Sequence, residues 1–349
     1  MPPGTLIIRA DASVAMGTGH VMRGLALAQT WQDEGGECIF AMAEAPAAVK
    51  QRLRAEKCDV FAIGASPASE LDAAQLVELG VAHRASWAVV DGYQFGVDYQ
   101  HALKAAGLKV LVVDDGGQCR GYCADLVLDQ GLDSSEEEYS NREVYTRLML
   151  GTRYVMLRRE FRAWRNWKRA TPPIAQRLLI TIGGSDPDGL TFRVIEALSK
   201  ATPPGLATTV LVGGSNPRMP ELRSVVNSTL SQVDLVCDPP NVPELMANSD
   251  LAVICAGGTL WELLYMGCAS LSYSRDEVQG QIVGKLHALG AVHNLGSVDK
   301  FEESGLITAI RELAISCRRR QDMAEIGRKM VDGEGPRRVV QELLRGDSA

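Results

Sequence analysis

The chain has 349 residues, 46% of them hydrophobic and 23% charged, which is typical of a folded protein large enough for two domains. Its net charge of −7 argues against electrostatic binding of nucleic acid, and we interpret the run Arg318-Arg319-Arg320 as a solvated helix face. No segment approaches the roughly 18 apolar residues that a membrane-spanning helix needs, and residues 6–8 are not preceded by a signal-peptide pattern. We therefore expect a cytoplasmic protein.

Short β-branched runs alternate with helical patterns, as in parallel βαβ units. The strands expected in the first half are residues 6–9, 38–41, 60–63, 87–91, 110–114 and 125–128, with helices that include 20–34, 47–55 and 99–106. Residues 154–170 differ, because basic and aromatic residues alternate there, and Thr171-Pro172-Pro173 ends this segment. We interpret it as an inter-domain connection.

A second series of strands and helices follows. Its expected strands are residues 178–182, 208–212, 233–237, 251–254, 269–273 and 293–295, and its expected helices are 190–199, 242–247, 259–266 and 281–289. From residue 304 the pattern is helical, apart from a break at 333–336. The sequence thus predicts two Rossmann-like, doubly wound α/β domains, residues 1–170 and 171–349, facing a central cleft at the carboxyl ends of their strands.

The first predicted strand leads through a glycine-containing loop into a helix that begins near His20. Glycine lets the backbone approach a ligand, and the helix N-terminus supplies N–H groups and a partial positive charge. That field favours a neutral imidazole, which can accept a proton from water, although His20 can also simply cap the helix. The neighbouring polar residues and glycines favour the catalytic interpretation. The candidates that accompany His20 are Asp11, Ser13, Gly17, Gly19 and Arg23.

Two glycine turns in the second half resemble phosphate-binding loops before helices. Asp186-Pro187-Asp188 matches the Asp-x-Asp of metal-dependent sugar transferases, but Asp beside Pro at a helix start is ordinary capping, so we predict no metal there. Glu262, assigned to the first turn of its helix, can bind a ribose diol or compensate the helix dipole, and spacing alone does not decide. The turn residues are Gly183, Gly184, Ser185, Gly257, Gly258 and Thr259.

Acidic and amide residues follow several other predicted strands. Carboxylates at strand ends can bind sugar hydroxyls or orient a base, and many only cap the next turn. Asp91 with Tyr93, and Asp114 with Asp115, occupy such positions. After residues 269–273, the side chains that can reach a sugar are Glu277, Gln279 and Gln281.

The spacing of the cysteines does not favour a metal site or a disulfide framework. Of the eight, only Cys119 and Cys123 lie close together, without a second pair at zinc spacing. We therefore expect reduced thiols, most of them buried. The remaining histidines are interpreted as structural: His83, His101, His287 and His293.

The chain resembles the bacterial UDP-2,4-diacetamido-2,4,6-trideoxy-β-L-altropyranose hydrolases of pseudaminic acid biosynthesis and the related spore-coat polysaccharide proteins. The resemblance spans nearly the whole chain. Its matching segments are residues 9–13, 17–23, 91–93, 113–115, 157–161, 181–187, 256–262 and 332–335. The C-terminal part alone would also match many two-domain sugar transferases.

The resemblance implies the GT-B architecture, a UDP-sugar bound by the C-terminal domain, and no metal or other cofactor. It also implies that His20 activates water for attack on C1 of the sugar, with Tyr93 near the reacting group. One departure concerns specificity. Where the family has a Glu-Asn-Gln-like segment, this chain has Glu277-Val278-Gln279, and losing the amide removes groups that discriminate sugar substituents. A glycosyltransferase and a non-catalytic nucleotide-sugar-binding protein are the alternatives, and the oligomeric state stays open.

Overall fold

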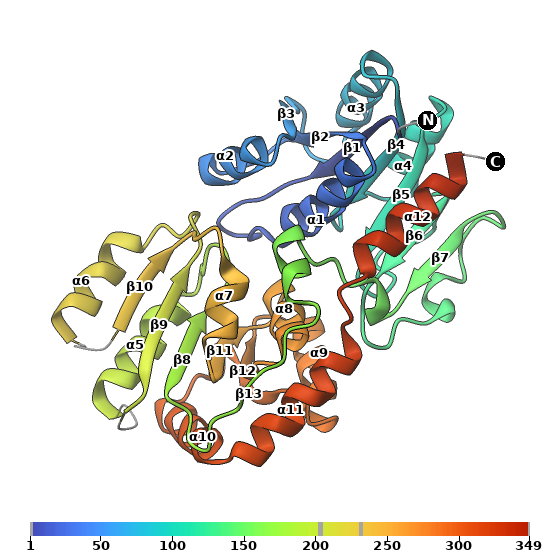
Figure 1. The fold of residues 1–349 in the computed structure, drawn as a ribbon. Helices are drawn as coiled ribbons and strands as arrows, with labels where there is room; N and C mark the ends of the chain where they lie inside the picture. Colours follow the sequence, from blue (N-terminus) through green and yellow to red (C-terminus); the bar gives the residue numbers. More distant parts are fainter. Residues whose placement is uncertain (1–2, 202–204, 230–232, 348–349) are drawn as a thin grey trace. The chain divides into compact units, whose positions relative to one another are not determined.

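The computed structural model describes residues 3–201, 205–229 and 233–347, and the chain divides into two compact units (Figure 1). Unit 1 comprises residues 1–13, 18–159 and 333–349, and unit 2 comprises residues 14–17 and 160–332. Both units are parallel sheets with interleaved helices, which confirms the predicted α/β class.

Unit 1 contains a parallel sheet of seven strands in the order β3-β2-β1-β4-β5-β6-β7. The order reverses direction between β1 and β4, the type of position at which open α/β sheets bind ligands. β7 was missed from the sequence, because its segment RLML lacks β-branched residues. The strands are β1 Thr5–Ala10, β2 Glu37–Met42, β3 Asp59–Ala62, β4 Ala85–Asp91, β5 Lys109–Asp114, β6 Leu126–Asp129 and β7 Arg147–Leu150. The helices are α1 Gly19–Asp33, α2 Ala47–Ala55, α3 Glu70–Ala82 and α4 Val97–Ala105, with 3₁₀ turns η1 Glu136–Tyr139, η2 Thr152–Tyr154 and η3 Arg159–Trp164.

Alternating side chains of the strands build two cores, one on each face of this sheet. In β1, Leu6 and Ile8 pack in the core that contains α1, whereas Ile7 packs in the core that contains residues of α3 and α4. Gly24 lets α1 lie close to the sheet, because a Cβ there would come within 3.1 Å of Ile8 Cγ2. This packing holds the start of α1 over the carboxyl edge of the sheet.

Unit 2 contains a six-stranded parallel sheet in the order β10-β9-β8-β11-β12-β13, with its change of direction between β8 and β11. All six strands predicted for this half are present. The strands are β8 Arg177–Thr181, β9 Ala207–Val212, β10 Val233–Cys237, β11 Leu251–Cys255, β12 Ala269–Ser274 and β13 His293–Ser297. The helices are α5 Leu190–Ala201, α6 Met219–Thr229, α7 Val242–Ala247, α8 Gly258–Met266, α9 Glu277–Ala288, α10 Glu303–Ile315 and α11 Cys317–Met330, with the 3₁₀ turn η4 Val298–Lys300.

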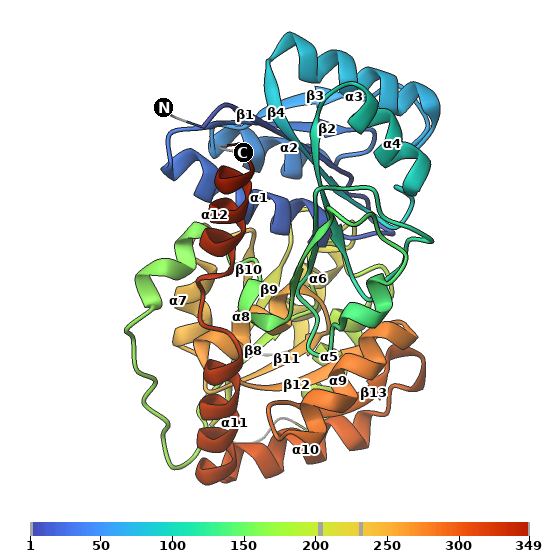
Figure 2. The ribbon, with the colours of Figure 1, turned by 90° about the vertical axis from the view of Figure 1, so that its right-hand side faces the viewer.

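The last helix, α12 (Gly335–Asp347), packs on α1 of unit 1, as both ribbon views show (Figures 1 and 2). Val339, Val340 and Leu343 lie in the same core as the α1 side chains. The sequence-based division at residue 170 assigned this helix to the second domain, whereas its contacts place it in unit 1. An amphipathic pattern shows that a helix is buried on one side but does not identify the sheet that it covers.

Candidate active site

Three neighbouring strands of unit 1 each end in an aspartate. Asp91 is the last residue of β4, Asp114 of β5 and Asp129 of β6. Because these strands are parallel, the three carboxylates lie along one edge of the sheet, beside the loop that leads from β1 into α1. The strand ends therefore line this edge with acidic side chains, of which Asp91 adjoins the change of direction between β1 and β4.

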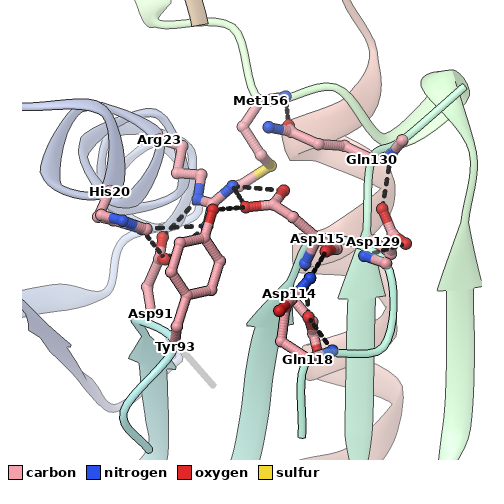
Figure 3. Close-up of polar contacts among 12 residues, drawn as sticks. His20, Arg23, Asp91, Tyr93, Asp114, Asp115, Gln118, Asp129, Gln130 and Met156 are labelled. Carbon is pink, nitrogen blue, oxygen red and sulfur yellow. Dashed lines mark hydrogen bonds and ion pairs between the residues drawn. The ribbon is translucent and has the colours of Figure 1, made fainter. Parts of the chain in front are cut away.

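His20, the second residue of α1, contacts the first of these carboxylates, as Figure 3 shows. Its Nδ1 lies 2.6 Å from Asp91 Oδ1. Arg23, one helical turn further on, donates from Nε to Asp91 Oδ2 at 2.6 Å and from Nη2 to Asp91 Oδ1 at 2.7 Å. His20 and Arg23, both predicted site residues, thus share one carboxylate, which was recognised in the sequence only as a strand-end acid.

The charge of Asp91 determines which nitrogen of His20 carries the proton. Burial raises the pKa of Asp91, but the charges and hydrogen bonds of Arg23 and His20 outweigh it and lower that pKa to about 2. The carboxylate is therefore ionised at neutral pH and only accepts hydrogen bonds, so His20 Nδ1 must donate to it. In neutral His20 the lone pair then resides on Nε2, the nitrogen that can take a proton from water.

Tyr93 and Asp115 complete this cluster. Arg23 Nη1 lies 2.8 and 2.9 Å from the two oxygens of Asp115, and the Tyr93 hydroxyl donates to Asp115 Oδ2 at 3.2 Å. The Tyr93 ring meets the imidazole of His20 edge to face, with centroids 5.5 Å apart. Loss of hydration at the hydroxyl and the Asp115 charge raise the pKa of Tyr93, so Tyr93 is suited to donate a hydrogen bond and not to act as a base.

Two tyrosines hold the loop that carries Asp115. The Tyr122 hydroxyl donates to Asp114 Oδ2, and the Tyr139 hydroxyl donates to Asp129 Oδ2 at 2.7 Å. Asp114 Oδ1 accepts the backbone N–H of Asp115 at 2.6 Å. Asp114 and Asp129 are therefore scaffold residues that position Asp115.

Asp11, another N-terminal candidate, has its printed contacts outside this cluster. Asp11 is buried and turns to the β2 side, where Oδ1 accepts the backbone N–H groups of Ala43 at 2.7 Å and Glu44 at 3.1 Å and pairs with Arg9 at 2.7 Å. These contacts support a structural role and not the predicted one in substrate binding. Among the other three, Ser13 is buried, Gly17 has a positive φ of 83° and is grouped with unit 2, and Gly19 starts α1.

In unit 2, the two predicted glycine turns follow β8 and β11, the strands that flank the change of direction. Gly183 has a φ of 93°, a conformation that favours glycine. Asp186 caps α5, since its oxygens accept the backbone N–H groups of Leu190 and Thr191, each at 2.9 Å. The capping interpretation of Asp186 is thus confirmed. The N-cap residue of α8 is Gly257, which has no side chain, so the first N–H groups of α8 are not capped as those of α5 are.

Three other predicted residues of unit 2 are placed more precisely by the structure. Glu262 is the fifth residue of α8, so its assignment to the first turn was wrong, and dipole compensation there loses its basis. Glu277 lies exposed in the first turn of α9. Gln279 is engaged locally: its Oε1 accepts the backbone N–H of Arg275 at 3.0 Å, while its own N–H donates to Asp276 Oδ1.

Metal and membrane interactions can be assessed for the described residues. Within them, no group of three or more His, Cys, Asp or Glu side chains is arranged to hold a metal ion. All eight cysteines are free thiols. No helix in the described ranges has the length and apolar character to cross a bilayer.

The two doubly wound sheets define a protein of the GT-B fold, as comparison with solved structures shows. MurG of Acinetobacter baumannii superposes with a TM-score of 0.63 at 13% identity, over 98% of this chain and 100% of that one. The spinosyn rhamnosyltransferase SpnG complexed with thymidine diphosphate gives a TM-score of 0.67 at 16% identity, over 97% and 99%. At these identities the likeness establishes the fold alone.

Sequence comparison identifies distant relatives, although no family model matches the chain. An uncharacterized protein of Methanocaldococcus jannaschii is 23% identical over 78% of this chain and 56% of its own length. The spore coat polysaccharide biosynthesis protein SpsG of Bacillus subtilis is 27% identical over 57% of this chain and 58% of its own length. The chain thus spans little more than half of these two relatives.

A third relative, the UDP-2,4-diacetamido-2,4,6-trideoxy-β-L-altropyranose hydrolase of Campylobacter jejuni, is 22% identical over 75% of this chain and 88% of its own length. The comparisons support a distant assignment to the family that includes this hydrolase and SpsG.

Proposed function

We propose that the protein hydrolyses a UDP-linked 2,4-diacetamido-2,4,6-trideoxyhexose at its anomeric carbon, without a metal ion. The products are UDP and the free sugar. The observation that carries this proposal is the pairing of His20 Nδ1 with the ionised Asp91 at 2.6 Å, which leaves Nε2 as the basic nitrogen. In this proposal His20 is the base, and the glycine turns after β8 and β11 are the nucleotide-binding groups.

In the proposed reaction, water attacks C1 from the face opposite UDP, and the C1–O bond to the β-phosphate breaks with its electron pair leaving on UDP. His20 Nε2 accepts the proton of the attacking water, and Asp91 stabilises the imidazolium that forms. A positioned general base contributes about 10²- to 10⁴-fold in rate. Backbone N–H groups at residues 183–185 and 257–259 are assigned to the diphosphate, whose negative charge grows as the bond breaks.

The sugar and the pathway in this proposal are taken from the names of two relatives of the chain. One is a hydrolase of a UDP-2,4-diacetamido-trideoxy sugar and another acts in polysaccharide biosynthesis. A cytoplasmic enzyme of pseudaminic-type acid biosynthesis follows as part of the proposal. Val278, 44% exposed at the start of α9, stands where the family has an amide, so it is the residue at which we expect the sugar preference to differ.

Mass spectrometry of products formed in ¹⁸O-water from a panel of UDP-sugars tests the reaction. Label in the sugar supports C–O cleavage, whereas label in the phosphate refutes it. His20→Asn should lose most turnover and still bind UDP, while His101→Asn, on the exposed side of α4, serves as the matched control. A His20→Asn enzyme with the kcat of the control would exclude His20 as the base.

A glycosyltransferase is the second candidate, since structural neighbours such as SpnG transfer sugars. In that case an acceptor hydroxyl replaces water, and the same imidazole deprotonates it. Incubation of the UDP-sugar without an acceptor separates the two, because only a hydrolase converts all the substrate. The third alternative, a non-catalytic binding protein, predicts nucleotide binding without turnover of any member of the panel.

A further inference from the structure

Arg275 follows directly after β12, and its backbone is hydrogen-bonded to the first turn of α9. Its backbone N–H donates to Gln279 Oε1 at 3.0 Å, and the next residue, Asp276, caps α9 by accepting the N–H of Gln279 at 2.8 Å. These reciprocal bonds fix the point from which the Arg275 side chain departs.

The side chain reaches across the end of β11 to the loop after β8. Arg275 Nε lies 2.8 Å from Asp188 Oδ2, and Nη2 donates to the carbonyl oxygen of Ile182 at 3.4 Å. Since β11 lies between β12 and β8 in the sheet, the guanidinium spans the change of strand direction from which both glycine turns depart. The side chains of Arg275 and Asp188 remain 27% and 42% exposed, so the pair is accessible to a ligand.

The two helices at this edge differ in how their first N–H groups are satisfied. The carboxylate of Asp186 already occupies the start of α5, so an anion there would meet a negative charge. The start of α8, after Gly257, has no side-chain cap and favours an anion. Ser185, in the turn after β8, is 1% exposed, and its Oγ has no hydrogen-bond partner among the residues that the structure describes.

We propose that Arg275 binds the diphosphate of the sugar nucleotide, and that Asp188 holds the guanidinium in place only until the ligand displaces it. This inference rests on the proposed function and adds to it a specific residue for the phosphate groups. A guanidinium offers five donors in a planar fork that suits phosphate oxygens, and the exposed carboxylate engages it at Nε. A diphosphate carries more negative charge than one carboxylate and therefore outcompetes Asp188.

Calorimetric titration of UDP, UMP and uridine tests this role with four proteins besides the wild type: Arg275→Gln, Asp188→Asn, the double variant and Arg177→Gln. Losing one charge-assisted contact should weaken UDP binding by about 10- to 100-fold in Arg275→Gln, UMP binding less, and uridine binding not at all. Asp188→Asn should tighten UDP binding by about two- to fivefold, since it removes an exposed competitor. The double variant should match Arg275→Gln.

Arg177→Gln is the matched control, because Arg177 pairs with Asp250 at 3.9 Å at the opposite end of β8. Its affinity for UDP should equal that of the wild type.

A purely structural role of Arg275 makes a different prediction. Arg275→Gln would then weaken the binding of uridine and of UDP equally, and Asp188→Asn would weaken the binding of both ligands. This pattern would overturn the proposal. If the wild type binds uridine and UDP equally well, or binds neither, the proposed function fails together with the inference. Wild-type preference for UDP that persists in Arg275→Gln refutes the inference alone.

Discussion

Replacement of Asp91 by Asn perturbs the candidate base with little change in side-chain shape. Asp91 Oδ1 accepts from His20 Nδ1 and Arg23 Nη2, and Oδ2 accepts from Arg23 Nε. An amide offers only one acceptor atom, so its NH₂ must face either Arg23 Nε alone or the imidazole together with Arg23 Nη2. If it faces His20, Nδ1 becomes the acceptor and the proton moves to Nε2. In both orientations the charge that stabilises the imidazolium is lost, and we expect kcat to fall by about 10²- to 10⁴-fold.

The same substitution has a stability effect whose size and sign follow from the pKa. The pKa of Asp91 is lowered from 3.8 to about 2, which at ~1.4 kcal/mol per pKa unit corresponds to about 2 kcal/mol of unfolding free energy. Because the folded-state pKa is the lower one, this stabilisation is present above about pH 4 and is lost as the pH falls towards 2. Asp91→Asn lacks this contribution at every pH, so the stability difference between wild type and variant should shrink by about 2 kcal/mol over that interval.

Two assays measure these effects: UDP release under saturating substrate, and urea unfolding followed between about pH 5 and pH 2. Asp98→Asn, an exposed aspartate in the first turn of α4, is the matched control and should change neither quantity. If Asp91→Asn keeps kcat within about threefold of this control, the action of His20 as a base does not depend on the Asp91 carboxylate. If the stability difference is independent of pH, Asp91 is not the strongly paired carboxylate that its contacts indicate.

Three further expectations follow. Tyr93→Phe keeps the ring beside His20 and loses the 3.2 Å bond to Asp115, so kcat should fall by less than about tenfold, whereas a larger loss would assign the hydroxyl a direct part in the reaction. Asp186→Ala should lower the unfolding free energy by about 1–2 kcal/mol, because the side-chain cap of α5 is lost. EDTA should leave the turnover of the wild type unchanged. A loss of activity that Mg²⁺ or Mn²⁺ restores would instead make Asp186 a metal ligand. Leu343→Ala should cost about 2–5 kcal/mol in urea unfolding, because Leu343 is fully buried in the unit 1 core, and a cost below 1 kcal/mol would show that α12 is dispensable.

Local patterns in the sequence are sufficient for most strands and turns of this protein, although not for β7. A buried parallel strand is a short apolar run, and a glycine turn follows where the chain must reverse tightly, so β1, β4, β8 and β11 and their loops can be predicted without knowing their neighbours. The capping role of Asp186 is equally local, because the acceptor and the N–H groups lie within five residues of each other. Contacts between distant segments have no such signature. The packing of α12 on α1 joins the two ends of the chain, and no periodicity within α12 specifies that partner.

The choice between two strand-end aspartates shows what strand order adds. Asp11 follows β1 and Asp91 ends β4, so both are candidates to hold His20, which lies at the start of the helix after β1. β1 has β2 on one side and β4 on the other. On the β2 side, the backbone N–H groups of Ala43 and Glu44, in the loop after β2, donate hydrogen bonds to the Asp11 carboxylate. Any backbone N–H group without a partner in secondary structure can do the same. On the β4 side the sheet changes direction, α1 begins there, and Asp91 meets a guanidinium and an imidazole instead of backbone donors. That Asp91, and not Asp11, contacts His20 therefore depends on which neighbour of β1 lies at the change of direction, which is a property of the whole sheet and not of either motif.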